Sequence, residues 1–216
     1  MIPGRERNPA GSLVKGAGNT YNWGVVDSQL ISDVQRLAGS LGQLPAPVAK
    51  PSLVVVSGLP GTGKSYFCGK LAERLPFILL ESDALRKVLF APPDYSRQES
   101  SRLFRAWHHL IAELLKKGFC LILDATNLSE RYRERLYSIA GRLDAELVLV
   151  KVEAPPEIVR ERLNNRQGTA ATSDADWAVY QRMRNSVQPI RRHHYVVDTS
   201  RDISPVVNKI VKMVGY

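Results

Sequence analysis

The chain has 216 residues, 44% of them hydrophobic and 24% charged, and its formal net charge is +9 at pH 7. A chain of this length forms one domain with room for a short appendage, and the composition excludes collagen, a disordered polymer and a coiled-coil rod. It contains no run of about 18 or more apolar residues that could span a membrane. Its two cysteines are too few for a disulfide framework. We therefore expect a globular, reduced protein of the cytoplasm.

The beginning of the chain differs from the rest. Residues 1–25 are rich in Gly, Asn, Pro and Ser, which predicts a flexible tail, and they lack the apolar core of a secretory signal. Between residues 27 and 41 apolar side chains recur every three or four positions, as in an amphipathic helix. A proline-rich linker follows at 43–51. We expect residues 1–50 to form this appendage and residues 51–216 the main domain. The helix could pack on that domain, form a dimer or bind a partner.

Beyond the linker, short apolar runs alternate with longer segments of helical periodicity. The runs expected to be strands are 53–56, 77–80, 119–123, 147–152 and 195–197. The segments expected to be helices are 64–75, 84–89, 100–117, 129–141, 156–165, 175–185 and 204–214. Several of the runs are continuously aliphatic, as in strands buried on both faces. Strict alternation favours right-handed crossovers and a parallel sheet. The expected fold is α/β, a three-layer sandwich with a five-stranded parallel sheet and helices on both faces.

A phosphate-binding loop follows the first expected strand, where residues 58–65 match the pattern G-x-x-x-x-G-K-[ST] and open a helix. The glycines let backbone N–H groups turn toward phosphate oxygens, and the helix points its positive dipole end at the same anion. Lys64 is expected to reach the β and γ phosphates and Ser65 to ligate Mg²⁺. The fold is therefore expected to be a P-loop NTPase, with ATP and Mg²⁺ as cofactors. The expected ATP-binding residues here are Gly58, Leu59, Pro60, Gly61, Thr62, Gly63, Lys64, Ser65 and Tyr66.

Asp124 ends the apolar run Leu121-Ile122-Leu123, which has the shape of a Walker B segment. A carboxylate at the carboxyl end of such a strand faces the ligand crevice. Asp124 is therefore expected to hold the metal together with Ser65, either directly or through water. The alternative is an ordinary strand-end aspartate that caps the next segment.

A second carboxylate, Asp83, lies at a strand-to-helix junction, where it can accept a proton from an attacking hydroxyl group. Arg86 lies one helical turn further on and faces the same side. A base next to a cation indicates a site for an anionic acceptor, whereas the alternative is a helix-capping aspartate with a surface arginine. Guanine-specificity signals of the N-K-x-D type are absent from the sequence.

Arg162 and Arg166 are spaced to lie on one face of the expected helix 156–165 and its continuation. A loop of glycine and small residues follows, which indicates a mobile lid that closes over the phosphates. The two arginines would then offset the charge on the transferring phosphoryl group. A solvated basic helix is the alternative.

Together these motifs resemble the P-loop kinases related to the 5′-kinase domain of phage polynucleotide kinase. The shared elements are the phosphate loop, S-D-x-x-R at 82–86, a strand ending in D-A-T-N at 124–127, and R-x-x-x-R at 162–166. The resemblance covers residues 53–197, most of the chain, and leaves the first fifty residues outside. Related proteins with these motifs phosphorylate sugars, antibiotics or other small alcohols.

The resemblance also implies a role for each motif. Asp83 would be the general base, and Arg86 would contact a phosphate of the acceptor. Asp124 and Asn127 would belong to the substrate site, and the lid arginines would contact the nucleotide phosphates. The residues implied in catalysis are Asp83, Lys64 and Arg166.

Three functions remain open from the sequence. A kinase that transfers the γ-phosphate of ATP to the 5′-hydroxyl of a polynucleotide is favoured by Arg86 and by the basic segment 158–216, which holds ten basic and five acidic residues. A kinase for a small molecule such as a sugar, nucleoside or antibiotic is favoured by the compact size. A nucleotide-binding switch that is not a kinase needs only the phosphate loop. None of the three calls for a membrane partner.

Overall fold

The computed structural model of the chain describes residues 27–165 and 175–215. Within them the strands form one sheet in the order β2-β3-β1-β4-β5, and all neighbouring strands are parallel. The strands are β1 (Ser52–Ser57), β2 (Ile78–Glu81), β3 (Leu121–Asp124), β4 (Glu146–Glu153) and β5 (Tyr195–Asp198). The predicted α/β fold with a five-stranded parallel sheet is confirmed.

The described helices are α1 (Ser28–Gly39), α2 (Lys64–Ala72), α3 (Ser82–Leu89), α4 (Arg97–Lys116), α5 (Glu130–Arg142), α6 (Pro156–Asn165), α7 (Trp177–Arg184) and α8 (Ser204–Val214). None of them has the length and apolar character needed to cross a bilayer. Most begin and end within a few residues of the predicted bounds. The largest shifts are at the end of α2 and at the start of α4. Helix α4 starts at Arg97 because the Ser96 hydroxyl accepts a hydrogen bond from the Glu99 N–H at 3.1 Å and so caps the helix.

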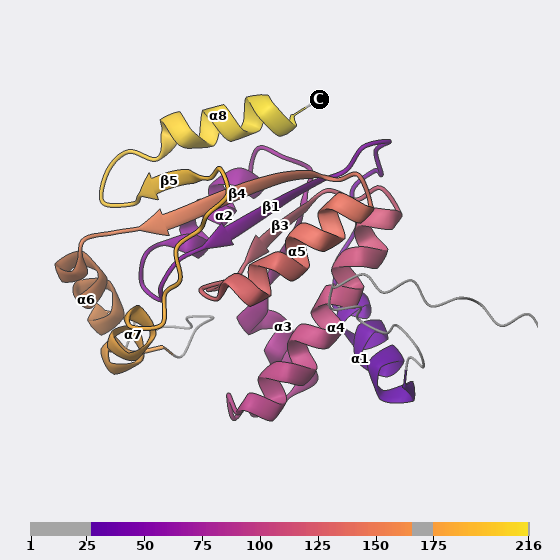
Figure 1. Cartoon of the computed structure of the whole chain (residues 1–216), viewed down its shortest axis with the longest axis horizontal. Helices are drawn as coiled ribbons and strands as arrows, with labels where there is room; N and C mark the ends of the chain where they lie inside the picture. The colour runs from indigo at the N-terminus through magenta and orange to yellow at the C-terminus, as the bar shows by residue number, and fades with distance from the viewer. Residues whose placement is uncertain (1–26, 166–174, 216) are drawn as a thin grey trace, which may run out of the picture.

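Helices cover both faces of the sheet (Figure 1). Successive side chains of a strand point to opposite faces, so Leu53 and Val55 of β1 join the core beneath α1, α3, α4 and α5. Val54 and Val56 join the second core, beneath α2 and α8. Helices α6 and α7 share a small core of their own at the end of the sheet toward which the strands point. The central strands β1 and β3 are therefore buried on both faces, whereas Val196 of the edge strand β5 is exposed.

Helix α1 packs on the same core as the main domain, which is one of the three alternatives left open by the sequence. Its apolar side chains Leu30, Val34 and Leu37 are buried against the neighbouring helices. Asp33 accepts two hydrogen bonds of 2.7 Å from Arg102 of α4, and these bonds, with a smaller contribution from the guanidinium charge, lower the pKa of the Asp33 carboxyl. The division of the chain at residue 50 stays a prediction, and the predicted tail 1–25 lies outside the described residues.

Candidate active site

The phosphate loop joins β1 to α2, and its backbone geometry depends on its glycines. Gly63 has a φ of +89°, a left-handed conformation that L side chains rarely adopt. A β-carbon on Gly58 would lie 2.4 Å from the carbonyl oxygen of Val152. Within the described residues, the N–H groups of Gly61 and Gly63 have no hydrogen-bond partner. The loop therefore offers free donors to an anion.

The first turn of α2 carries the polar side chains of the motif. The Lys64 ammonium lies over the loop and donates to the Leu59 carbonyl at 3.1 Å. The Ser65 hydroxyl donates to Oδ2 of Asp124 at 2.5 Å, and Tyr66 is exposed to solvent. The structure thus brings together the predicted nucleotide-binding residues 58–66 and the strand-end carboxylate of β3.

The Ser65–Asp124 pair fits a magnesium ion bound to a nucleotide. A hydroxyl and a carboxylate oxygen are the hard ligands that Mg²⁺ takes. Ser65 directly follows the loop that offers N–H groups to phosphates, and Asp124 contacts Ser65. Among the described residues no three His, Cys, Asp or Glu side chains gather as a metal site. A protein cage of that kind is not needed, because phosphate-loop enzymes hold Mg²⁺ with few side chains together with the nucleotide phosphates.

The segment after β3 is tied to the start of the phosphate loop. The Ser57 hydroxyl donates to the Thr126 and Asn127 carbonyls, both at 3.1 Å, and the Gly58 N–H donates to the Thr126 carbonyl at 3.2 Å. The Asn127 side-chain amide donates to the Val56 carbonyl at 2.9 Å. Asn127 is buried, so its amide group joins β1 to the β3–α5 loop.

Three carboxylates gather at the carboxyl ends of β2 and β3. Glu81 is in register with Asp124 on the neighbouring strand, and Asp83 lies in the first turn of α3. Burial, followed by the negative charges of Asp124 and Asp83, raises the pKa of the Glu81 carboxyl above its ordinary value. Within the described residues Asp83 has no hydrogen-bond or ion-pair partner. Asp83 is therefore available to a substrate hydroxyl. Glu81, which directly precedes S-D-x-x-R and to which the sequence assigned no role, is a further member of this carboxylate cluster.

Arg86 forms a buried ion pair with Glu99 of α4. Its second terminal nitrogen donates to the Ser100 hydroxyl at 3.3 Å, and its guanidinium lies 4.9 Å from the centre of the Tyr95 ring. Its Nε has no partner in the described part of the chain. The guanidinium predicted to meet an anionic acceptor is thus paired with a carboxylate, a partner that lies 13 residues away in the sequence.

Arg162 of α6 contacts the loop after β5. Its terminal nitrogens donate to the Thr199 hydroxyl at 2.7 Å and to the Thr199 carbonyl at 2.9 Å. The Thr199 hydroxyl in turn donates to the Thr62 carbonyl in the phosphate loop at 2.7 Å. Thr199 is a buried residue of the site that the motifs did not indicate. Arg166 and most of the predicted lid loop lie outside the described residues.

Arg133 of α5 follows the D-A-T-N segment in the sequence and is buried. Its side chain is 1% exposed and donates to the carbonyls of Asn127 at 2.8 Å and of Gln188 and Pro189 at 2.9 Å. It also pairs with Glu130 at 2.5 Å. Arg133 therefore fastens the chain after α7 to the loop that carries Asn127.

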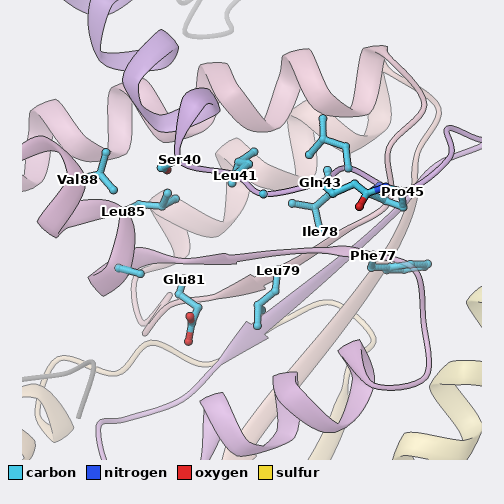
Figure 2. Close-up of a pocket in the computed structure, with 13 residues that line it drawn as sticks. Ser40, Leu41, Gln43, Pro45, Phe77, Ile78, Leu79, Glu81, Leu85 and Val88 are labelled. Atoms are coloured by element: carbon cyan, nitrogen blue, oxygen red, sulfur yellow. The ribbon is translucent and has the colours of Figure 1, made fainter. Parts of the chain in front are cut away.

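A pocket of about 380 Å³ lies at the edge of the sheet. One wall is the segment from Ser40 to Pro45, which leads away from α1, and the other is built by β2 and α3 (Figure 2). Leu85 and Val88 of α3 line it together with residues of β2, and Glu81 is the member of the carboxylate cluster that also borders it. The pocket is distinct from the phosphate loop.

The parallel sheet, the glycine loop and the Ser65–Asp124 pair define a protein of the P-loop class, with a loop whose geometry suits the phosphates of a nucleotide. A family model described as an AAA domain matches residues 53–190, more than half of the chain. The chain therefore belongs to this family.

Its relatives include kinases with different acceptors. The chain is 30% identical over 115 residues to the L-seryl-tRNA(Sec) kinase of Methanococcus maripaludis, a match that covers 51% of this chain and 44% of the relative. It is 30% identical over 124 residues to the gluconokinase of Gluconobacter oxydans, covering 55% of this chain and 67% of the relative. The chain thus spans less than half the length of the first of these relatives. Both relatives are kinases by name, and each match covers about half of this chain.

The fold agrees with this assignment. A crystal structure of a gluconokinase from Sinorhizobium meliloti superimposes with a TM-score of 0.56 and 20% identity, over 76% of this chain and 94% of that one. At this identity the likeness shows the fold alone. The specific resemblance to phage polynucleotide kinase is not shown by these comparisons.

Proposed function

We propose that the protein is a kinase that transfers the γ-phosphate of ATP to a hydroxyl group of a small molecule. The observation that carries this proposal is the contact between Ser65 and Asp124 at 2.5 Å below the phosphate loop, next to the unpaired carboxylate of Asp83. A nucleotide switch needs the first feature but has no use for a free carboxylate beside it.

The roles of the residues follow from this arrangement. The backbone N–H groups of the loop and Lys64 bind the phosphates and orient the γ-phosphoryl group for in-line attack. Ser65 and Asp124 would hold Mg²⁺, which neutralises charge on the phosphates when it is bound. Asp83 accepts the proton of the acceptor hydroxyl as the new P–O bond forms, and ADP leaves. Glu81 stands beside this carboxylate and can accept a hydrogen bond from another hydroxyl of the acceptor.

A small acceptor is favoured over a polynucleotide by Arg86. In the polynucleotide hypothesis its guanidinium binds a phosphate of the acceptor, but the positive charge is already balanced by the buried Glu99. A phosphate brought to this place would meet a carboxylate as well as a guanidinium. The gluconokinase relative, whose name gives a small hydroxyl compound as its acceptor, favours the same choice.

Transfer of labelled γ-phosphate from ATP to a panel of acceptors tests the proposal. The panel contains sugar acids, polyols, nucleosides and aminoglycosides, together with a 5′-hydroxyl oligonucleotide as the competing acceptor. We expect transfer to a member of the small-molecule group and none above background to the oligonucleotide. Labelling of the oligonucleotide in preference to all small acceptors would contradict the choice of a small substrate. An ATP hydrolysis rate that no acceptor changes would favour the nucleotide switch.

Lys64→Ala is the matched control for nucleotide dependence, because it removes a phosphate-binding group without touching the carboxylate cluster. Both ATP binding and transfer should fall together in this variant. Transfer that persists in Lys64→Ala would come from a contaminating kinase and not from this protein.

A further inference from the structure

A chain of hydrogen bonds runs from helix α6 to the phosphate loop through one buried threonine. Arg162 donates to the Thr199 hydroxyl at 2.7 Å and to the Thr199 carbonyl at 2.9 Å. The same hydroxyl donates its single proton to the Thr62 carbonyl at 2.7 Å. Because Arg162 can only donate, the direction of every bond in this chain is fixed.

This chain of hydrogen bonds determines where one N–H group of the phosphate loop points. The carbonyl of Thr62 and the N–H of Gly63 belong to one planar trans peptide, so they point in opposite directions. When Thr199 holds the carbonyl on its side, the Gly63 N–H is turned away from Thr199. That N–H has no partner among the described residues and is thereby left for an anion.

The close fit around Gly63 supports the same role for Thr199. A β-carbon on Gly63 would lie 2.9 Å from the Thr199 hydroxyl oxygen. This short distance shows that Thr199, which is 7% exposed, packs directly against the left-handed turn at Gly63. Its hydroxyl binds the Thr62 carbonyl, and its side chain packs against Gly63, so both contacts restrict the Thr62–Gly63 peptide.

Helix α6 contacts the loop at a second place as well. A β-carbon on Gly61 would lie 2.9 Å from side-chain atoms of Val159 and of Leu163, and Leu59 packs against the same small core. Arg162 lies on this helix between them. The helix is therefore braced on the phosphate loop by an apolar contact at Gly61 and by the polar chain that ends at Thr62.

We propose that Thr199 is a positioning residue through which Arg162 and helix α6 set the orientation of the phosphate loop, and hence its affinity for ADP and ATP alike. Arg162 acts on the nucleotide through Thr199, not by direct contact with the γ-phosphate. This inference rests on nucleotide binding only, so it stands or falls independently of the phosphate acceptor.

A double-mutant cycle on the full chain tests it, with Mg–ATP and Mg–ADP as probes in calorimetry. Thr199→Val keeps the shape and removes the hydroxyl, and the loss of its hydrogen bond to the Thr62 carbonyl predicts a rise of about fivefold to tenfold in both Kd values. Thr199→Ser keeps the hydroxyl and should stay within about twofold of the wild type. Arg162→Ala should weaken both nucleotides, and the double variant should bind no more weakly than the worse single variant.

Three results would overturn the proposal. A Kd for Thr199→Val within about twofold of the wild type would show that the hydroxyl does not position the loop. Additive losses in the double variant would show that the two residues act separately. A loss confined to ATP in Arg162→Ala would indicate direct contact with the γ-phosphate. Melting of each variant without nucleotide, compared with Thr199→Ser, distinguishes a change in the loop from a general loss of folding.

Discussion

Replacement of Arg86 by methionine would separate a structural role of this arginine from a substrate-binding one. Arg86 and Glu99 are 7% and 6% exposed, so the substitution leaves a carboxylate buried without its counterion. Breaking such a pair costs about 3–5 kcal/mol, against a folding free energy of about 5–15 kcal/mol for a typical domain. We expect Arg86→Met to lower the melting temperature by about 10 °C.

A second substitution should restore most of this stability. Glu99 also accepts a hydrogen bond of 2.7 Å from the Asp94 N–H, and Glu99→Gln removes the charge while keeping that acceptor oxygen. The double variant Arg86→Met/Glu99→Gln holds no buried charge at this place, and uncharged replacements of buried pairs are often close to neutral. Urea unfolding of the wild type, the two single variants and the double variant gives the coupling free energy between residues 86 and 99. Additive losses in the double variant would refute the argument from the buried pair.

The same double variant tests whether Arg86 binds the phosphate acceptor. With folding restored, it should retain phosphoryl transfer to the small acceptor, because Arg86 is engaged with Glu99 and not with substrate. A rise of about 100-fold or more in the KM for the acceptor at unchanged ATP affinity would show that Arg86 binds the acceptor and would refute a purely structural role.

Two further predictions concern the phosphate loop and the response to acid. Gly58→Ala should weaken Mg–ATP binding by about 100-fold or more in calorimetry, because its β-carbon would meet a backbone oxygen at 2.4 Å; binding within about tenfold of the wild type would contradict the close approach. Burial, followed by the charges of Arg135 and His109, lowers the pKa of His108 to about 4 from 6.5. The unfolded chain therefore takes up a proton below pH 6.5 that folded His108 takes up only near pH 4, so stability falls by about 3 kcal/mol as the pH drops through this window. Urea unfolding of His108→Phe should lack this part of the decline, and an unchanged pH slope would contradict the neutral state of buried His108.

Local patterns in the sequence were enough to predict the fold and the nucleotide loop. The central strands β1 and β3 are short, largely aliphatic runs buried on both faces, and such runs differ plainly from the helical periodicity between them. The phosphate loop could be predicted because all its groups lie within residues 58–66, so that spacing alone brings them together. Asp124 could be added because parallel strands end at the same edge of the sheet.

The partners of the arginines could not be predicted, because they come from distant parts of the chain. Arg86 pairs with a residue of the next helix, and Arg162 with a residue 37 positions away. The side chain of Asn127 reaches a carbonyl 71 positions away. A motif shows that an arginine or asparagine is present, but only the packing of helices on the sheet decides whether it meets a carboxylate, a carbonyl or open solvent.

Phosphoryl transfer and ATP affinity of Asp83→Ala, measured side by side, test most directly whether Asp83 is the base of a kinase. Asp83 lies in α3 and outside the phosphate loop, so we expect transfer to fall by about 100-fold or more while the Kd for ATP stays within about twofold. Asp83→Asn, which keeps the shape and removes the base, should behave in the same way. Equal losses of transfer and ATP binding, or transfer that survives in both variants, would contradict this role of Asp83.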